Sequence, residues 1–526
     1  TSNNNQSISD IDIISSKMHK NIIKETVKED NSSYSRMGFD YYIDTANTIG
    51  LLFTHNYLHT DSKSASFSTY KQEYKADSLF LFDQTNHLIG HKTENTFSTY
   101  YNKKYKKEKG ELDISFDWYR SRYERDIAYE ISQTITNISN DYTTNAGLNA
   151  NITDLAASTN HKILNDGNLE VGTKLEMISC DNYFTFDWEG KNLDSLALKY
   201  KYKQNINALY LMVEKPIMKK CTLNIGIRAE HEEFNGSNSQ SEELYNDENI
   251  ALFPSFSISY TPNKKNQYNM QFSRTITRYP FENTSKFKRY IDLYTFTQGN
   301  PELQPLKVYN IDFNYTFNQW FLVSLFYNRG ENSFYTKIFE DGNYTRITYL
   351  NNPLLEFLGF DYSVNKSIAK WWNCNINYAF AFQNSLNYDE KSMSRFFENR
   401  PYSEMNVSQV FSVKRSKLEI LFWRKGLLKS GLEYECPRYS FDVSFKQIVD
   451  KHQRWTITVS ATDILRSLKP LVKTRGDAYP YTYLNSSDSQ QIWLKMIYKF
   501  GNLKTKKSSK RNYKNTDIEN ISKASL

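Results

Sequence analysis

Residues Arg278–Asn328 read RYPFENTSKFKRYIDLYTFTQGNPELQPLKVYNIDFNYTFNQWFLVSLFYN, and they contain the pattern that decides the fold. Apolar and polar residues alternate strictly in its second half. The apolar set is Tyr309, Ile311, Phe313, Tyr315 and Phe317, and it resumes after a turn at Asn318–Gln319 with Phe321, Val323, Leu325 and Tyr327. Successive side chains of a strand point to opposite faces, so this pattern makes a ribbon with one apolar and one polar face. Sustained along a chain, it predicts a barrel with lipid outside and water or protein inside.

The same alternation recurs between turn signals from about Met37 to Phe500. Clear examples occupy residues 222–230, 255–260, 372–382, 439–446, 455–461 and 492–500. Strands of roughly ten residues can cross a bilayer at a tilt, and this length leaves room for about 18–22 strands. The sequence therefore predicts an all-β fold, a large antiparallel transmembrane β-barrel of the outer-membrane type.

The connectors between these runs alternate in length. Glu214–Lys220, Thr261–Asn266 and Asn318–Gln319 are short, whereas His231–Ile250 and Arg278–Leu306 are long. Outer-membrane barrels have short periplasmic turns and long extracellular loops. A soluble β-sandwich has no reason to alternate loop length in this way, so the connectors favour a barrel.

The overall hydropathy of the chain does not distinguish a transmembrane barrel from a soluble protein. Of 526 residues 39 % are hydrophobic, and the mean hydropathy is −0.68. No run of about 18 apolar residues occurs, which excludes a transmembrane helix but not a barrel, whose strands keep one polar face. Aromatic residues reach 15 %. Aromatic girdles at the membrane interfaces would explain this excess, and so would a soluble all-β surface lectin, which stays an alternative.

Charge and cysteine spacing exclude other classes. The net charge of +7 is mild and gathers partly in the tail after Phe500, with no module that would read nucleic acid. The four cysteines are far apart and form no pair or His cluster typical of a zinc site. No HExxH, G-x-S-x-G or P-loop motif is present. We therefore expect no enzyme activity, no catalytic residue, no metal site and no cofactor.

Several motifs, in order, resemble one family. They are GFDYYIDTANTIGLLFTHNY (Gly38–Tyr57), QNINALYLMVEKP (Gln204–Pro216), LNIGIRAEHEEF (Leu223–Phe234), FPSFSISYTPNKKNQYNMQFSRTITRYPF (Phe253–Phe281), QGNPELQPLKVYNIDFNYTF (Gln298–Phe317), SATDILRS (Ser460–Ser467) and IYKFGN (Ile497–Asn502). Together they resemble the Bacteroidota-type outer-membrane β-barrel of TonB-dependent receptors. The chain departs from the pattern at Tyr279, which stands between an Arg and a Pro that are usually adjacent, and at Asp312, where Glu is common.

The resemblance implies a function. Family members bind a scarce ligand on extracellular loops and import it with energy delivered through TonB. The implied partners are outer-membrane lipid, an extracellular small ligand, glycan or peptide, and the TonB complex through a plug domain that nothing in this chain resembles. The implied location is the cell outer membrane. A plugless outer-membrane pore or adhesin, using its loops for binding, is the alternative.

Ligand contacts are expected in the long loops. In Arg278–Leu306 the candidates are Tyr279, Phe281, Tyr290 and Tyr294, because aromatic rings can stack on sugars or chelate rings. The acidic connector His231–Ile250 could hold a hard cation or could be a solvated loop. Arg228, Arg274 and Arg278 are expected to face the lumen. Residues carried over from the family motifs as structural are Arg274, Arg278, Gly299, Asn300, Pro301, Pro305 and Phe500.

Three segments follow from this reading. Residues 1–35 are expected to be a polar N-terminal segment or a remnant of the early barrel, and residues 36–500 the barrel itself, with its first strands missing. Residues 501–526 are expected to be a basic, disordered periplasmic tail.

Overall fold

The computed structural model of the chain describes residues 2–13, 18–72, 79–105, 110–133, 138–163, 166–189, 191–192, 197–238, 241–280, 283–284, 288–292, 295–341, 344–389, 394–430, 433–474, 481–487 and 489–500. The regular elements in these ranges are β-strands. Within the same ranges, no helix is long and apolar enough to cross a membrane.

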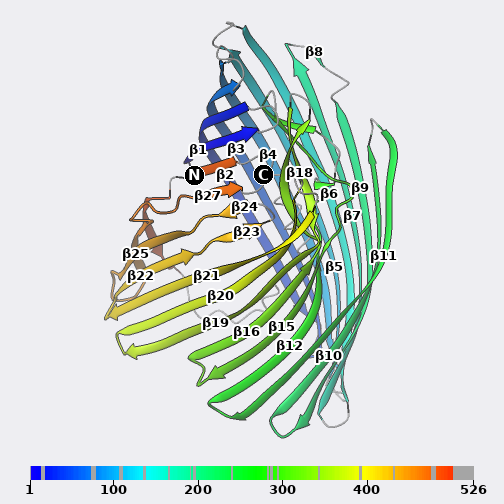
Figure 1. Cartoon of the computed structure of the whole chain (residues 1–526). Coiled ribbons are helices and arrows are strands. Elements are labelled where there is room, and N and C mark those ends of the chain that lie inside the picture. Colours follow the sequence, from blue (N-terminus) through cyan, green and yellow to red (C-terminus); the bar gives the residue numbers. More distant parts are fainter. Residues whose placement is uncertain are drawn as a thin grey trace.

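The N-terminal part of the main sheet consists of long antiparallel strands (Figure 1). They are β1 (Ser2–Ile13), β2 (Met18–Tyr42), β3 (Asn47–Gln72), β4 (Leu79–Lys104), β5 (Glu111–Gln133), β6 (Ile138–Ile163) and β7 (Gly167–Trp188). β3 has 26 residues. At about 3.3 Å per residue it is roughly 86 Å long, whereas the hydrocarbon of a bilayer is about 30 Å thick. Much of each of the strands β2 to β7, which have 22 to 26 residues, therefore lies beyond the membrane.

The ladder continues, strand after strand, around the rest of the wall. Its members are β9 (Leu198–Met218), β10 (Cys221–Asn238), β11 (Ser241–Asn263), β12 (Asn266–Thr277), β15 (Leu306–Phe317), β16 (Phe321–Glu331), β19 (Leu354–Ala369), β20 (Trp372–Asp389), β21 (Ser394–Val413), β22 (Ser416–Lys425), β25 (Arg438–Ile448), β26 (Trp455–Thr462) and β29 (Gln491–Tyr498). Neighbouring strands are antiparallel, as in the pair of β15 and β16, where Phe317 lies opposite Phe321.

Short strands lie at the loop end of the barrel, opposite the tight turns. β8 (Lys191–Asn192), β23 (Leu428–Ser430), β24 (Glu433–Glu435), β27 (Leu471–Thr474) and β28 (Tyr481–Ser487) bring the main sheet to 25 described strands. A separate four-stranded sheet contains β13 (Lys288–Asp292), β14 (Thr295–Gln298), β17 (Ser333–Asp341) and β18 (Tyr344–Asn352). Figure 1 shows β18 within the curve of the main sheet. The long strands alone agree with the predicted count of about 18–22.

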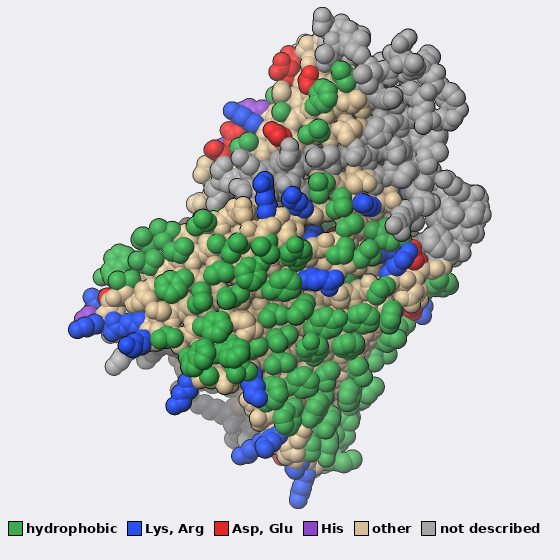
Figure 2. Space-filling model, turned by 60° about the vertical axis from the view of Figure 1, so that its left-hand side comes forward, with side chains coloured by type: hydrophobic (Ala, Val, Ile, Leu, Met, Phe, Trp, Pro, Cys, Tyr) green, Lys and Arg blue, Asp and Glu red, His purple; other side chains and the backbone are tan. Residues whose placement is uncertain are grey.

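The two faces of the wall differ as the alternation predicted. On β15, Ile311 and Phe313 are 40 % and 42 % exposed, while Asn310, Asp312 and Asn314 are half-buried. Leu209, Leu325 and Leu358 are more than half exposed on other strands. Figure 2 shows hydrophobic side chains covering much of the outer surface in the lower part of the molecule. A surface this apolar is suited to lipid, so the all-β barrel prediction is confirmed.

The connectors confirm one part of the length pattern and correct another. Tight turns join one end of the strands, as at Lys264–Lys265 between β11 and β12. The prediction that His231–Ile250 is a loop was wrong, because β10 and β11 continue as a paired ladder from Cys221↔Tyr260 to Gly236↔Tyr245. The Arg278–Leu306 connector likewise contains β13 and β14.

The first and last strands of the wall are paired along only part of their length. β1 pairs with β28 from Asn5↔Ser487 to Ile11↔Tyr481, at the loop end. In the described part of the chain, β29 pairs with β26 alone, and residues 31–42 of β2 pair with β3 alone. Residues 1–35 thus contribute β1 and part of β2 to the sheet, while the domain limits stay predictions. The basic tail, residues 501–526, lies outside the described residues.

Candidate ligand site at the loop end of the barrel

A pocket of about 380 Å³ lies at the loop end, where the upper inner wall meets the segment after β12. β9 contributes Tyr202 and Gln204, and β10 contributes Glu232 and Phe234. The other side is formed by Arg278, Tyr279 and the run from Pro301 to Pro305, together with part of β11. The pocket therefore joins a rigid wall to the connector in which ligand contacts were predicted.

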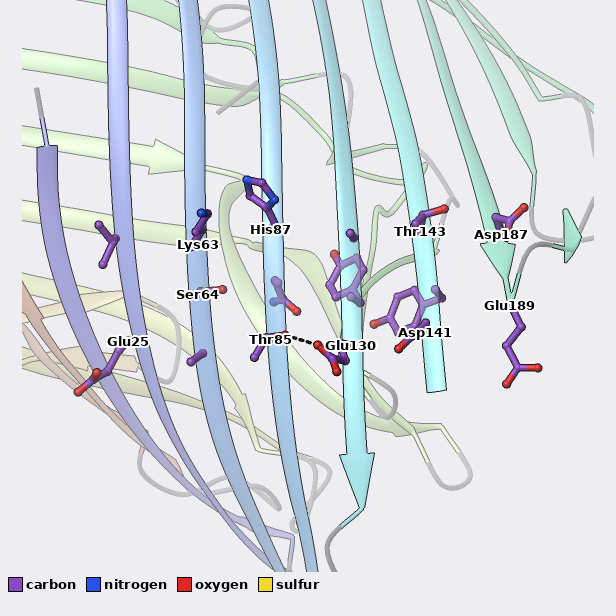
Figure 3. A pocket seen from close by; sticks show the side chains of 16 residues that line it. Glu25, Lys63, Ser64, Thr85, His87, Glu130, Asp141, Thr143, Asp187 and Glu189 are labelled. Atoms are coloured by element: carbon purple, nitrogen blue, oxygen red, sulfur yellow. Dashed lines mark hydrogen bonds between the residues drawn. The ribbon is translucent and has the colours of Figure 1, made fainter. Parts of the chain in front are cut away.

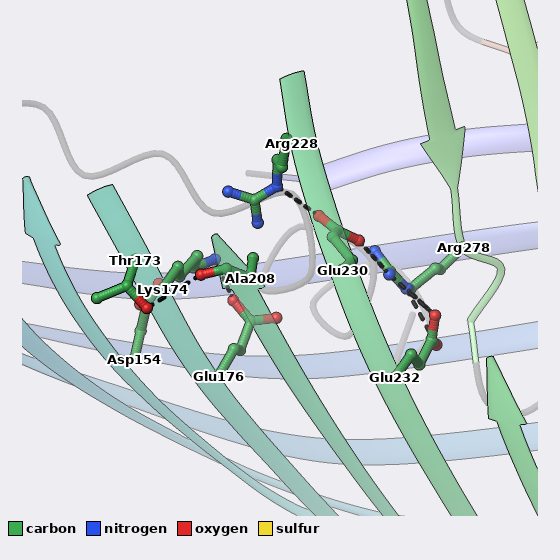
Figure 4. Close-up of polar contacts among 9 residues, drawn as sticks. All are labelled: Asp154, Thr173, Lys174, Glu176, Ala208, Arg228, Glu230, Glu232 and Arg278. Atoms are coloured by element: carbon green, nitrogen blue, oxygen red, sulfur yellow. Dashed lines mark hydrogen bonds and ion pairs between the residues drawn. The ribbon is translucent and has the colours of Figure 1, made fainter. Parts of the chain in front are cut away.

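Arg278 fastens this connector to the wall (Figure 4). Its Nη2 lies 2.8 Å from Glu230 Oε2 and 2.9 Å from Glu232 Oε2, and its Nε donates to Glu232 Oε1 at 3.1 Å. Arg228 holds the other oxygen of Glu230 at 2.7 Å. Residues 228, 230 and 232 share one face because side chains repeat every two residues along a strand. The Arg278 side chain is only 15 % exposed. Burial alone lowers its pKa, but the two carboxylates outweigh burial and raise it.

Tyr279 lines the pocket, as predicted for a ligand-binding residue, although ligand contact itself stays a prediction. Its hydroxyl donates to the carbonyl of Leu303, and its ring meets Phe334 edge-on at 6.3 Å between centroids. Burial, followed by the negative charge of Glu232, raises the pKa of its hydroxyl. The phenol therefore stays neutral and its ring is held as part of the pocket wall.

The other three predicted aromatic residues cannot be placed in the pocket. Tyr290 lies on β13 opposite Phe296. Phe281 and Tyr294 lie outside the described residues.

The GNP motif at Gly299–Pro301 forms a turn that anchors the connector. The Asn300 amide donates to Asn283 at 2.6 Å, and its Nδ2 donates to the carbonyl of Tyr349 at 3.0 Å. Pro301 and Pro305 line the pocket. The structural role that the family resemblance implies for these residues stays a prediction.

Arg274 does not face the lumen, which corrects the prediction. It shares the face of Met270, which is 47 % exposed, because the two are four residues apart on β12. Its guanidinium lies 5.5 Å from the ring centre of Tyr309, and Nη1 donates to the Leu252 carbonyl at 2.8 Å. An Arg at this height covers apolar surface with its stem and reaches polar groups with its tip.

Phe500, beyond β29, is 85 % exposed.

Sequence reasoning missed the pocket's polar floor. Gln204 donates from Nε2 to Glu232, and this pair joins β9 to β10. Each residue lies in a family motif, but neither motif indicates that the two side chains meet. The alternating run 222–230 already placed Glu230 on the polar face, and counting two residues further would have placed Glu232 there as well. The loop interpretation of His231–Ile250 prevented that count.

Three potential metal ligands meet on the opposite, outer face. One ligand atom each from His231, Glu233 and Glu248 lies within 4.8 Å of the others. His231 Nε2 is 2.8 Å from Glu248 Oε1. Imidazole and carboxylate groups could bind a divalent cation, so the expected absence of a metal site stays a prediction.

The inner wall of the barrel also carries paired charges. Lys174 Nζ lies 3.1 Å from Asp154 and also contacts Glu176, and Lys92 lies 3.1 Å from Glu94. Figure 4 shows the Lys174 group on the same wall as the Arg278 group. Such residues suit a lumen filled by water or a polar protein segment.

Asp463, in the SATDILRS motif, organises the connector that follows β26. Its carboxylate accepts hydrogen bonds from the amides of Ser467 at 2.8 Å and Leu468 at 3.1 Å, and from Ser489 Oγ at 2.5 Å. Its own amide donates to Asp442 at 2.8 Å. The residue is fully buried. Burial raises the pKa of this carboxyl, but the hydrogen bonds from Ser489 and Ser467 outweigh burial and hold it below its ordinary value.

Asp463→Asn is expected to loosen residues 464–490. Asparagine tolerates the local φ of 43° but removes the charge, so the loss should be on the order of 1.5–3 kcal/mol of local stability. Because the folded pKa is depressed, the wild-type contribution is complete above the unfolded pKa of about 3.9 and falls as pH drops through the folded pKa. Limited proteolysis between pH 3 and 6 measures this. Equal cleavage of both proteins at pH 6 would contradict the role.

Comparison with known proteins gives the same architecture. The model of the outer membrane protein beta-barrel family matches residues 103–498. No curated protein matches the chain.

Solved receptors share the fold at low sequence identity. The chain is similar to the ferric-catecholate import receptor Fiu from E. coli K12, with 9 % identity, a TM-score of 0.52, and coverage of 93 % of this chain and 82 % of that one. It is similar to the FpvAI–pyocin S2 complex at 7 % identity and a TM-score of 0.51, covering 92 % and 73 %. The ferric enterobactin receptor PfeA in complex with BCV-L6 has 10 % identity and a TM-score of 0.50, covering 92 % and 81 %. These likenesses show the fold. With the family match over most of its length, the chain belongs to the outer membrane protein beta-barrel family and is a β-barrel of the cell outer membrane.

Proposed function

We propose that the chain is the barrel portion of a TonB-dependent receptor that binds a scarce ligand at its loop end and imports it. The observation that carries this proposal is the pocket of about 380 Å³ between the Arg278–Glu232 anchor and the Pro301–Pro305 run. Concave sites with a few fixed polar groups are the usual form of small-ligand sites.

The placement of the pocket suits capture from outside. It lies at the end of the barrel opposite the tight turns, and the inner wall of the barrel carries ion pairs at Lys92 and Lys174. A ligand released from the pocket would enter a polar interior. Passage through that interior would be coupled to TonB by a plug domain, as the family resemblance implies. The absence of enzymatic activity remains a prediction.

Uptake by living cells tests the proposal. Cells carrying the full chain in the outer membrane would receive labelled ferric enterobactin, cyanocobalamin, an oligosaccharide and a peptide in turn. We expect one probe to bind saturably and to accumulate only in cells with a working TonB complex. Tyr279→Ala should weaken binding of that probe about tenfold, whereas Tyr309→Ala, on the outer face, should leave it unchanged.

Two outcomes would contradict import. Entry of all probes in proportion to concentration, with or without TonB, would make the chain a plugless pore. Saturable binding with no accumulation would make it an adhesin.

A further inference from the structure

A second hollow, of about 700 Å³, crosses β2 to β7 on their outer face (Figure 3). We call it the outer groove. Two neighbouring register rows line it. The first row is Glu25, Ala65, Thr85, Glu130 and Asp141, and the second is Val27, Lys63, His87, Ala128, Thr143 and Asp187. These residues have the same strand parity as Phe53 and Phe97, which face outward lower down, so the groove does not open into the lumen.

The outer groove lies above the lipid. The outward residues of β3 that follow its tight turn, Ile49, Leu51 and Phe53, are apolar, and Tyr57 and Phe67 are exposed on the same face farther along. Lys63 is fourteen residues beyond Ile49, which corresponds to roughly 46 Å along the strand and, at a tilt of about 40°, to roughly 35 Å along the membrane normal. That distance exceeds the thickness of the hydrocarbon layer, about 30 Å. The outer groove therefore faces the outside of the cell surface.

Small side chains create the hollow. Ala65, Thr85, Ala128 and Thr143 occupy the middle of the two rows and leave the floor low. Six strands with about 4.8 Å between neighbours make the groove roughly 24 Å long across the sheet. An extended peptide of about seven residues has that length.

The charges of the groove are unbalanced. Glu130 and Asp141 lie directly opposite each other on β5 and β6, and Asp187 and Glu189 are nearby on and after β7. Figure 3 shows these four carboxylates in sequence along one half of the groove. Like charges placed opposite each other on neighbouring strands are destabilising. Glu25 lies at the other end, and Lys63 and His87 lie between, with His87 Nε2 3.0 Å from Asp61.

The spacing of these acids argues against a single metal ion. In the described part of the chain, the one group of three ligand atoms close enough for an ion is that of His231, Glu233 and Glu248, on other strands. The carboxylates of the outer groove are spread along its length instead. Several cationic groups on one extended ligand would match that distribution.

We propose that the outer groove binds an extended, lysine- or arginine-rich peptide segment of an extracellular partner, lying across β2 to β7. Its cationic side chains pair with Glu130, Asp141, Asp187 and Glu189, and its backbone lies over Ala65 and Ala128. Because this surface is separate from the lumen pocket, the proposal does not depend on the import function.

The test measures binding of a fluorescein-labelled Lys-Thr-Lys-Thr-Lys-Thr-Lys peptide to the full chain in neutral detergent, by fluorescence anisotropy. The triple variant Glu130→Gln, Asp141→Asn, Asp187→Asn should raise Kd at least about tenfold, since each lost ion pair is modest alone. The matched control Glu124→Gln, Asp126→Asn, Asp181→Asn removes three outward charges from β5 and β7 outside the groove. It should change Kd less than about twofold.

A shape variant separates a groove from a merely acidic surface. Ala128→Trp fills the floor without changing charge and should also abolish peptide binding, while heat-modifiable migration in gels confirms that the barrel is folded. Equal losses in the two triple variants, or normal binding by Ala128→Trp, would overturn the proposal. So would calcium binding that the groove triple variant loses while its peptide affinity stays unchanged, because the occupant would then be an ion.

Discussion

Arg278→Ala is expected to destabilise the loop end of the barrel by about 3–5 kcal/mol, because it leaves two buried carboxylates without their shared cation. The Glu230 and Glu232 side chains are only 9 % and 14 % exposed. Arg228 can still compensate Glu230, but Glu232 keeps only Gln204 among the described partners given above. The connector from Pro280 to Pro305 should then detach from the wall. Guanidinium unfolding, followed by tryptophan fluorescence, and protease cleavage within this connector measure the two effects.

A control on an exposed pair makes this result specific. Arg122 contacts Glu124 at 2.6 Å, but its side chain is 59 % exposed. Exposed ion pairs contribute about 0–1 kcal/mol, so Arg122→Ala should be nearly silent. Arg278→Lys keeps the charge but loses the bidentate contact. Its loss of stability should therefore lie between the losses of Arg278→Ala and Arg122→Ala. Equal stability of Arg278→Ala and Arg122→Ala would show that the Arg278 anchor does not hold the connector.

Phe313→Arg is expected to cost about 2–4 kcal/mol of barrel stability, since it places a charge on the lipid-facing side near the middle of a strand. Phe313 is 42 % exposed and lies opposite Leu325, which is 57 % exposed. The neighbouring substitution Asn314→Arg points into the lumen, where charges are tolerated, and should cost much less. Refolding into lipid vesicles at graded urea concentrations measures both.

The prediction is that Phe313→Arg costs more barrel stability than Asn314→Arg. A water-soluble sandwich would reverse it, because Phe313 would be packed inside and Asn314 would face water. Equal effects of the two substitutions would mean that the two faces of β15 do not differ in their surroundings.

Strict alternation made the barrel wall predictable from sequence. Along β15 and β16, lipid on one side and a polar lumen on the other force a period of two, and a slip of one residue would exchange the faces. The wall therefore follows from local pattern alone in residues such as Ile311 and Phe313.

The pattern weakens where lipid ends. Above the membrane both faces of β10 and β11 meet water or polar groups, so His231–Ile250 has the composition of a loop although it is a paired ladder. The second sheet was unpredictable for another reason. Thr295 pairs with Thr345 across a long sequence separation, and nothing local to either strand encodes that contact.

The candidate site was half predictable. The aromatic rings of the connector pointed to Tyr279, and the family motif pointed to Asn300 and Pro301. The structure places all three on one connector, with Tyr279 and Pro301 lining the pocket. The Glu232–Gln204 floor depends on the register between β9 and β10, which the sequence alone did not reveal. Arg274 was assigned to the wrong face because its charge was given more weight than its place in the alternation of the strand. It comes two residues after Phe272, so it lies on the outer face.

Labelling of intact cells tests the central claim most directly. Two variants, Glu302→Cys and Lys264→Cys, are each made in a Cys436→Ser background. Glu302 is exposed at the loop end, and Lys264 is exposed in the tight turn after β11. The remaining native cysteines are buried. A membrane-impermeant maleimide should label Glu302→Cys in intact cells and Lys264→Cys only after the outer membrane is opened. Labelling of Lys264→Cys in intact cells, with Glu302→Cys protected, would contradict the orientation on which the ligand site depends.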